Sequence, residues 1–161
     1  MSHRVPEGIR HFIQSHFTLT LATADGDQPW AAALYYVSDG ALNLYFTSDP
    51  ESRHVREGLG TGRVAVAIHG AHQPWGTIRG IQMQGRLAAI APGDRESVEA
   101  IYFARFTDVS FMIRSPADAM QMRIAEKFGS SVFYRVTPLR LRYIDNRCGF
   151  GKPEEIDLQV P

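Results

Sequence analysis

The residues of this sequence with the clearest potential for chemistry lie between Thr47 and His54, where a predicted strand runs into a predicted short helix. Ser48 and Ser52 add hydroxyl donors to that of Thr47, and Arg53 and His54 add cations. Hydroxyls and cations at a helix N-terminus favour an anion such as a phosphate group. The helix end itself contributes only about 0.3–1 kcal/mol, so Arg53 would supply most of the affinity. A capped surface helix with solvated arginines fits the same residues, and both interpretations stay open at this point.

Other reactive residues lack the neighbours that a site needs. His69 and His72 lie three residues apart, but no carboxylate stands at metal-ligand spacing, so we predict no metal site. Cys148 is the only cysteine, which excludes an intramolecular disulfide, and no base accompanies it. The glycine patterns of serine hydrolases, phosphate-binding loops and Rossmann folds are missing, so the catalytic residues are unknown.

Length and charge narrow the class of protein. The 161 residues suit one domain, which we place at residues 1–161. Seventeen Lys and Arg balance seventeen Asp and Glu, which argues against a nucleic-acid partner. No apolar run nears the ~20 residues of a membrane helix, and the N-terminus lacks the apolar core of a secretory signal. We therefore expect a cytoplasmic protein without a membrane partner.

The elements that position the candidate phosphate segment are short strands joined by tight turns. Helical spacing of apolar residues predicts a helix over about residues 5–16. Alternation predicts strands over residues 17–23, 30–37 and 41–47, which we expect to pair in sequence as an antiparallel meander. The second turn contains residues 39–40 (Asp-Gly), where glycine accepts a positive φ at little cost.

The short helix that follows the third strand is predicted from its ends. We expect it to start at Pro50, which a first helical turn tolerates, with a side-chain cap just before it. Val55 and Leu59 would face inward, and the glycines of residues 58–60 would end the helix.

A long strand dominates the prediction for the middle of the chain. After a strand around residues 64–68, residues 76–90 form a bent strand in which Gly80 and Gly85 mark kinks or close approaches. Strands of this length are typical of barrels, where strands tilt and bend to close.

The last third combines helices with one more strand. We expect a helix over residues 94–106 and a strand over residues 132–144, with a loop-like tail after it. A second helix begins near residue 115, and its stripe of Met120, Ile124 and Phe128 reads as core. Helices confined to the start and the late part of the chain favour an antiparallel barrel over alternating βαβ units.

The order of these elements carries a resemblance to a known family. The run of residues 44–48 (Leu-Tyr-Phe-Thr-Ser), followed by residues 51–54 (Glu-Ser-Arg-His), resembles the pyridoxamine 5′-phosphate oxidase-like FMN-binding proteins. The resemblance covers roughly residues 10–150. It implies a mainly β fold, an antiparallel split β-barrel with an N-terminal helix and helices after the long central strand.

The resemblance also implies a cofactor, FMN, and the residues that hold its phosphate. These are Ser48, Ser52, Arg53 and His54, with Phe46 and Thr47 at the end of the strand. His54 stands where the family usually has lysine, so we expect weaker or pH-dependent phosphate binding.

Further contacts to the flavin ring follow from the same resemblance. The backbone of Ala31, Ala32 and Ala33 would run along the ring edge, and Gln82 of the long strand would contact it. The closing residues 144–152 resemble a small branch of the family that ends in an Asp-Asn…Gly-Phe-Gly-Lys segment. Because family members usually bind flavin between two subunits, we expect a homodimer with the flavin at its interface. The tail, with Trp75 or Phe150, would then cover the ring from the partner chain, and Asn146 and Lys152 are further candidates for cofactor contacts.

The function implied is that of a flavin-dependent oxidoreductase of unknown small-molecule substrate, with a nicotinamide as one candidate electron donor. Two alternatives remain: a non-catalytic flavin carrier or redox-responsive binding protein, and a dimeric barrel that has lost the cofactor. FAD, a deazaflavin or haem could replace FMN. Oxidation of pyridoxamine phosphate is not expected, because the arginine-containing C-terminal motif for that substrate is not recognisable.

Overall fold

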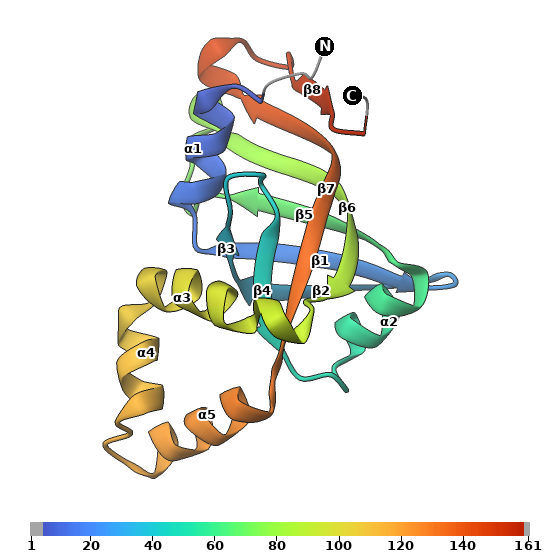
Figure 1. Ribbon diagram of the computed structural model, residues 1–161. Coiled ribbons are helices and arrows are strands. Elements are labelled where there is room, and N and C mark those ends of the chain that lie inside the picture. Colours follow the sequence, from blue (N-terminus) through green and yellow to red (C-terminus); the bar gives the residue numbers. More distant parts are fainter. Residues whose placement is uncertain (1–4, 160–161) are drawn as a thin grey trace.

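The computed structural model describes residues 5–159, in which eight strands form one antiparallel sheet and five α-helices pack around it or project from it (Figure 1). The predicted domain also includes residues 1–4 and 160–161, which lie outside the described part. The strands are β1 (Thr18–Asp25), β2 (Gln28–Tyr35), β3 (Val37–Ser38), β4 (Leu44–Ser48), β5 (Arg63–His69), β6 (Arg79–Ala89), β7 (Val132–Asp145) and β8 (Glu154–Asp157). The helices are α1 (Glu7–Ser15), α2 (Arg53–Thr61), α3 (Arg95–Arg105), α4 (Thr107–Arg114) and α5 (Ala119–Ser130), with short 3-10 turns η1 (Trp75–Thr77), η2 (Pro92–Asp94) and η3 (Asn146–Cys148).

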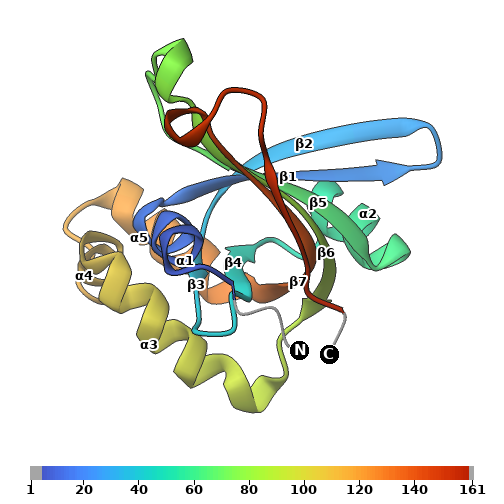
Figure 2. The ribbon, with the colours of Figure 1, turned by 90° about the horizontal axis from the view of Figure 1, so that it is seen from above.

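The sheet rolls up into a half-barrel because its two end strands are consecutive in sequence. Its order is β2-β1-β5-β6-β7-β4-β3, and only Tyr36 separates β2 from β3 (Figure 2). The first hairpin of the predicted meander is confirmed, because β2 pairs with β1. The rest is wrong: the predicted strand 30–37 is divided at Tyr36, and only its end, β3, pairs with β4, which in turn pairs with β7. Tyr36 is buried at the crossing, and its hydroxyl donates to the carbonyl of Ile13. The alternation of apolar and polar residues identified the strands, but a local pattern does not specify which other strand pairs with each edge of a strand.

The strand β7 organises the sheet through both of its edges. One edge pairs with β6 along nearly its whole length. The other edge is divided, because β4 pairs with its first residues and β8 with a later segment. The loop predicted over residues 145–152 contains only the short turn η3 beyond Asp145, and the strand β8, which the sequence analysis did not predict, follows it.

Two clusters of buried side chains fill the space on either side of β4 and β7. The larger lies inside the curl and is closed by apolar residues of α1. The smaller lies between the other face of these strands and α3, with Tyr45 and Phe133 packed against Tyr102 and Phe106. Alternate residues of β4 supply both clusters, since successive strand residues point to opposite faces.

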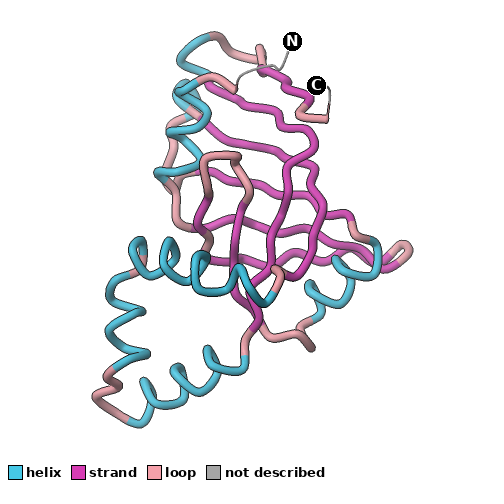
Figure 3. The backbone as a smooth tube through the Cα atoms, in the orientation of Figure 1, coloured by secondary structure: helices cyan, strands magenta, loops and turns pink. Residues whose placement is uncertain are grey.

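The stripe on α5 is not core, contrary to the prediction. Met120 is 69% exposed, and no residue of α4 or α5 is fully buried. Ile124 is half-buried, and Phe128 only flanks the smaller cluster. Figure 3 shows the reason, because α4 and α5 leave the strands as an arm that joins α3 to β7. The sequence analysis missed α4, having placed only a connection between Phe106 and Ser115.

The helix α2 begins three residues later and ends later than predicted. Pro50 lies in a turn, and the helix starts at Arg53 without a side-chain cap. It ends before Gly62, which has a left-handed φ of 66°. Val55 is buried as expected, whereas Leu59 is 43% exposed, because the inward position is occupied by Gly58 against β5 and β6.

The two glycines of the long strand lie at close approaches, as predicted. A Cβ atom on Gly80 would lie 3.2 Å from the carbonyl oxygen of Ile68. At Gly85, where the register between β6 and β7 shifts opposite Pro138, a Cβ atom would lie 2.4 Å from Val136 Cγ1.

We expect Gly85→Ala to lower the free energy of unfolding by about 1–3 kcal/mol, because the added methyl group forces β6 away from β7. Urea unfolding followed by circular dichroism measures the change. Gly60→Ala is the control, since a Cβ there meets nothing within 4 Å and helical Ala is favoured over Gly by up to about 1 kcal/mol. A Gly85→Ala chain as stable as the wild type would contradict this close approach.

Candidate functional site

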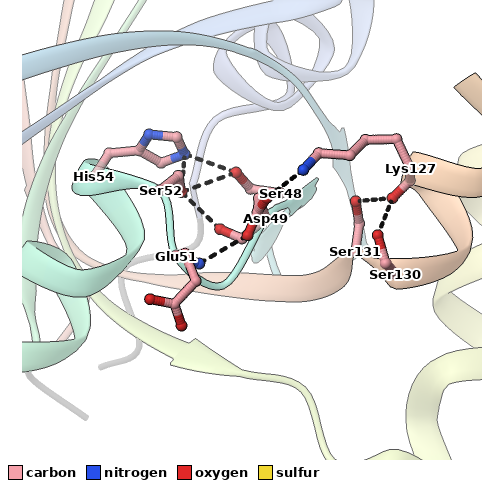
Figure 4. Close-up of polar contacts among 8 residues, drawn as sticks. All are labelled: Ser48, Asp49, Glu51, Ser52, His54, Lys127, Ser130 and Ser131. Atoms are coloured by element: carbon pink, nitrogen blue, oxygen red, sulfur yellow. Dashed lines mark hydrogen bonds and ion pairs between the residues drawn. The ribbon is translucent and has the colours of Figure 1, made fainter. Parts of the chain in front are cut away.

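Three polar side chains converge where β4 ends and α2 begins (Figure 4). Ser48 Oγ lies 2.9 Å from His54 Nε2 and 3.2 Å from Ser52 Oγ. Ser52 Oγ lies 3.3 Å from the same imidazole nitrogen and donates to the carbonyl of Asp49 at 2.7 Å. The fold thus brings together three of the four residues expected to hold a phosphate.

The turn that precedes α2 is shaped by Asp49. Its Oδ1 accepts a hydrogen bond from the backbone N–H of Glu51 at 2.9 Å, and its carbonyl accepts from the N–H of Ser52 at 3.0 Å. Ser52 is the N-cap residue of α2, but its hydroxyl points to Asp49 and His54 and caps no helical N–H. The first N–H groups of α2 are therefore left without a side-chain acceptor, and such groups favour an anion.

The imidazole of His54 rests on a buried aromatic ring. Phe46 is fully buried, with its ring centroid 6.4 Å from that of His54 and 5.6 Å from that of Tyr134. Burial lowers the pKa of His54, and the carboxylate of Glu57 opposes this effect only in part. The imidazole is therefore mainly neutral at pH 7. Phe46, which was expected among the cofactor residues, supports His54 from below.

Arg53 points away from the hydroxyl groups and toward β2. Its Nε donates to Glu57 Oε1 at 2.5 Å, and its guanidinium lies 4.5 Å from the ring centroid of Trp30. Glu57 Oε2 also accepts from the hydroxyl of Thr23 at 2.7 Å, and the bond from Arg53 is the largest cause of its lowered pKa. Arg53 also lines a groove of about 590 Å³ between α2 and the β1–β2 turn, together with Arg56. Arg53 thus adjoins the converging hydroxyls without contacting them.

Thr47 is separated from Ser48 by the alternation of β4. Its hydroxyl is buried and has no hydrogen-bond partner among the described residues. Residues 45 and 47 share one face of the strand, and Phe46 and Ser48 share the other. The sequence analysis grouped Thr47 with the phosphate residues, and the structure directs its side chain elsewhere.

The alanines of β2 lie on an exposed sheet face. Among the strands of residues 5–159, only β1 pairs with β2, and Ala31 and Ala33 are exposed while Ala32 is half-buried and points the opposite way. The pairing register places Ala33, Thr20, Ala67 and Gln82 in one row across four strands. Ala33 and Gln82 therefore lie about 14 Å apart on one face lined by small side chains.

The predicted tail residues assemble with one another but not with the hydroxyl groups. Trp75 and Phe150 are 77% and 70% exposed, with ring centroids 6.5 Å apart. The side-chain amide of Asn146 donates to the carbonyl of Trp75 at 3.0 Å, and the N–H of Lys152 donates to the carbonyl of Gly149. This aromatic pair lies beyond the Asp145 end of β7, whereas Ser48 pairs at the Val132 end. The 14 residues between them span roughly 40 Å.

Sequence reasoning missed the residues that neutralise charge around this site. Lys127 Nζ on α5 donates to Asp49 Oδ2, and Glu57 pairs with Arg53. A signal for Glu57 existed, because it follows Arg53 by four residues on a helix. The sequence contains no such signal for Lys127, because Lys127 lies 78 residues from Asp49 along the chain.

Residues 5–159 offer neither a metal site nor a membrane-spanning helix. Within this part of the chain, no three His, Cys, Asp or Glu side chains gather to hold a metal ion. None of its helices is both long and apolar enough to cross a membrane.

Comparison with known proteins places the fold. Residues 5–145 match the family model described as pyridoxamine 5′-phosphate oxidase. A UPF0306 protein of Photorhabdus laumondii is 26% identical over 145 residues, which cover 89% of this chain and 90% of the relative. Two solved structures share the fold. A haem-binding protein of Mycobacterium smegmatis has a TM-score of 0.67 at 15% identity, covering 97% of this chain and 60% of that one. A FAD-binding protein of Mesorhizobium loti has a TM-score of 0.61 at 18% identity, covering 83% and 87%.

We expect the NMR titration of His54 to have a midpoint below 6.5, the value of a free imidazole. Because the folded chain disfavours the charged form, the stability that depends on neutral His54 is present above about pH 6.5 and is lost as the pH falls through the lowered pKa. Urea unfolding between about pH 5 and 8 should therefore show a smaller loss of stability at acid pH for His54→Gln than for the wild type. Equal pH slopes for the two chains would rule out a depressed pKa.

Proposed function

Because this chain belongs to the pyridoxamine 5′-phosphate oxidase family, we propose that it binds FMN with the phosphate at the junction of β4 and α2. The observation that carries the proposal is the convergence of Ser48, Ser52 and His54 beside the uncapped N-terminus of α2. These groups can all donate hydrogen bonds to one anion.

The residues present fit a phosphate with limited rearrangement. The hydroxyls of Ser48 and Ser52 bond only to each other, to His54 and to a carbonyl, so they can turn toward a phosphate. Arg53 is 40% exposed and can turn toward a phosphate oxygen, while Glu57, which is only 9% exposed, would keep the hydrogen bond from the hydroxyl of Thr23. The ring of the flavin would lie along β2, where alanines allow close approach of the backbone.

We propose that the protein is a homodimer, because within one chain the tail residues do not reach the junction of β4 and α2. The tail pair of Trp75 and Phe150 lies at the far end of β7 from Ser48. A second copy can bring its own tail, with Asn146 and Lys152, over a ring bound on the first. The exposure of both aromatic rings agrees with a surface that a partner covers.

The proposed activity is that of an oxidoreductase that uses a nicotinamide donor. The bound flavin would supply hydride and electron transfer. The chain itself would hold the phosphate, orient the ring against β2 and exclude water through the partner's tail. A flavin carrier without catalysis would use the same contacts, but a nicotinamide would not reduce its flavin.

Haem is the competing cofactor, since one similar structure is that of a haem-binding protein. The arrangement around His54 argues against haem at this site. His54 Nε2 is already within hydrogen-bond distance of two hydroxyl groups, and its ring is packed on Phe46. As an axial ligand Nε2 would lose both of these hydrogen bonds, whereas a phosphate can accept from the two hydroxyls and from Nε2 together.

We expect FMN to raise the melting temperature, because a ligand at ~100 times its dissociation constant adds ~2.7 kcal/mol to the free energy of unfolding. Riboflavin, which lacks the phosphate, should bind more weakly, and Ser48→Ala with Ser52→Ala should weaken FMN by about tenfold or more. Ser97→Ala on α3 is the control, since its hydroxyl bonds only locally to the carbonyl of Asp94. Parallel melts with FAD, a deazaflavin and haem identify the cofactor, and bleaching of the flavin by NADH or NADPH separates an enzyme from a carrier. A shift with haem alone would sink the proposal.

We expect His54→Lys to tighten FMN binding more at about pH 8 than at about pH 5.5. The lysine is charged at both values, whereas the wild-type imidazole gains its charge only as the pH falls. The ionisation of the phosphate itself is common to both chains and cancels in the comparison. Fluorescence quenching of FMN measures both affinities. The same gain at both values would show that the charge of His54 plays no part.

A further inference from the structure

Residues 48–57 alone supply little free positive charge to balance a phosphate at the junction of β4 and α2. Arg53 is paired with Glu57, and His54 is held mainly neutral by burial. The carboxylate of Asp49 remains within the turn, next to the two hydroxyl residues. A dianion placed there would meet a negative charge at short range.

Lys127 on α5 reaches this turn from outside the segment (Figure 4). Its ammonium donates to Asp49 Oδ2, and this bond is the largest cause of the lowered pKa of Asp49. The hydroxyls of Ser130 and Ser131 donate to the carbonyl of Lys127 at 3.0 Å and 2.7 Å, which fixes the last turn of α5.

The sheet register enforces this position of Lys127. The chain leaves α5 through Ser131 and enters β7 at Val132, which pairs directly with Ser48. The end of α5 is therefore held beside the end of β4 by the ladder of the sheet. Only four residues lie between Lys127 and Val132, so the backbone of Lys127 stays close to the turn.

We propose that Lys127 is a phosphate-binding residue of this site, an inference that rests on the proposed function and deepens it. An ammonium group has three donors, and Asp49 uses one. The side chain is 65% exposed, so the other donors can reach a ligand. Lys127 thus neutralises Asp49 and binds the phosphate at the same time, and it ties the site to the helical arm.

A purely structural role for Lys127 makes a different prediction, and two variants separate the roles. If Lys127 binds the phosphate, Lys127→Met weakens FMN by about fivefold at low salt. Asp49→Asn then leaves FMN affinity equal or higher, because it removes a negative charge while Asn keeps an oxygen for the N–H of Glu51. If Lys127 only fastens α5 to the turn, both variants lose the same bond and weaken FMN alike. That second outcome overturns the proposal.

The controls exclude a general effect of charge or folding. Arg123 is an exposed cation one turn earlier on α5, without an ion pair among the described residues, so Arg123→Met should change FMN affinity less than twofold. Riboflavin affinity should be unchanged in Lys127→Met, since riboflavin has no phosphate. Urea midpoints of all variants show whether they remain folded.

Inorganic phosphate provides a test that needs no flavin. Its binding to the wild type, followed by the width of the ³¹P NMR signal, should weaken in Lys127→Met and persist in Arg123→Met. This result supports Lys127 even where FMN fails to bind, in which case the proposed function alone falls. Wild-type binding of FMN or phosphate that Lys127→Met leaves unchanged overturns the role of Lys127 and spares the function. Binding of neither ligand to the wild type overturns both.

Discussion

The strand β7 is the constraint on which the rest of the structure depends. It carries β6 on one edge and divides the other between β4 and β8. This pairing sets Ser48 opposite Val132, and thereby sets the end of α5 beside the turn that leads into α2. It also sends the chain at Asp145 to the opposite end of the sheet, where the tail begins. The Gly85 close approach keeps the long β6–β7 ladder closed at its bend.

The charges at the junction of β4 and α2 are neutralised in two ion pairs. Arg53 pairs with Glu57 and Lys127 with Asp49, and both cations are at least 40% exposed. The side chains of Lys127 and Asp49 are 65% and 36% exposed, so their pair stabilises little and the proposed phosphate could recruit Lys127. Glu57 is only 9% exposed, so a phosphate that recruits Arg53 would leave that carboxylate with the hydroxyl of Thr23. His54 differs, because its charge must be gained against burial. The side chains of the proposed phosphate site therefore already lie together without a ligand, whereas His54 does not yet carry its positive charge.

Local patterns in the sequence identified most elements and the segment that the site uses. Alternation located the strands, and the glycines of β6 marked true close approaches because a missing Cβ is a local property. The predicted pairing of β2 with β1 was confirmed, but its predicted pairing with β4 was wrong, since strand order depends on contacts between distant segments. The stripe on α5 was assigned to the core for a related reason. Amphipathic spacing shows that a helix has an apolar face, but not whether that face packs against the rest of the chain. Ser48, Ser52 and His54 were found from their types and spacing, whereas Lys127 lies 78 residues from Asp49 and needed the fold.

The division of the predicted site along β7 has a consequence for assembly. A rigid ladder of roughly 40 Å cannot fold back to bring Phe150 to Ser48 within one chain. In the proposed homodimer, the tail of a second copy would reach the β4–α2 junction of the first. The row of Ala33, Thr20 and Ala67, which ends at Gln82, would line that arrangement, because its first three side chains are short enough to let another surface approach closely. In such a dimer the exposed rings of Trp75 and Phe150 would be buried, and their apolar surface would favour the association that completes the site.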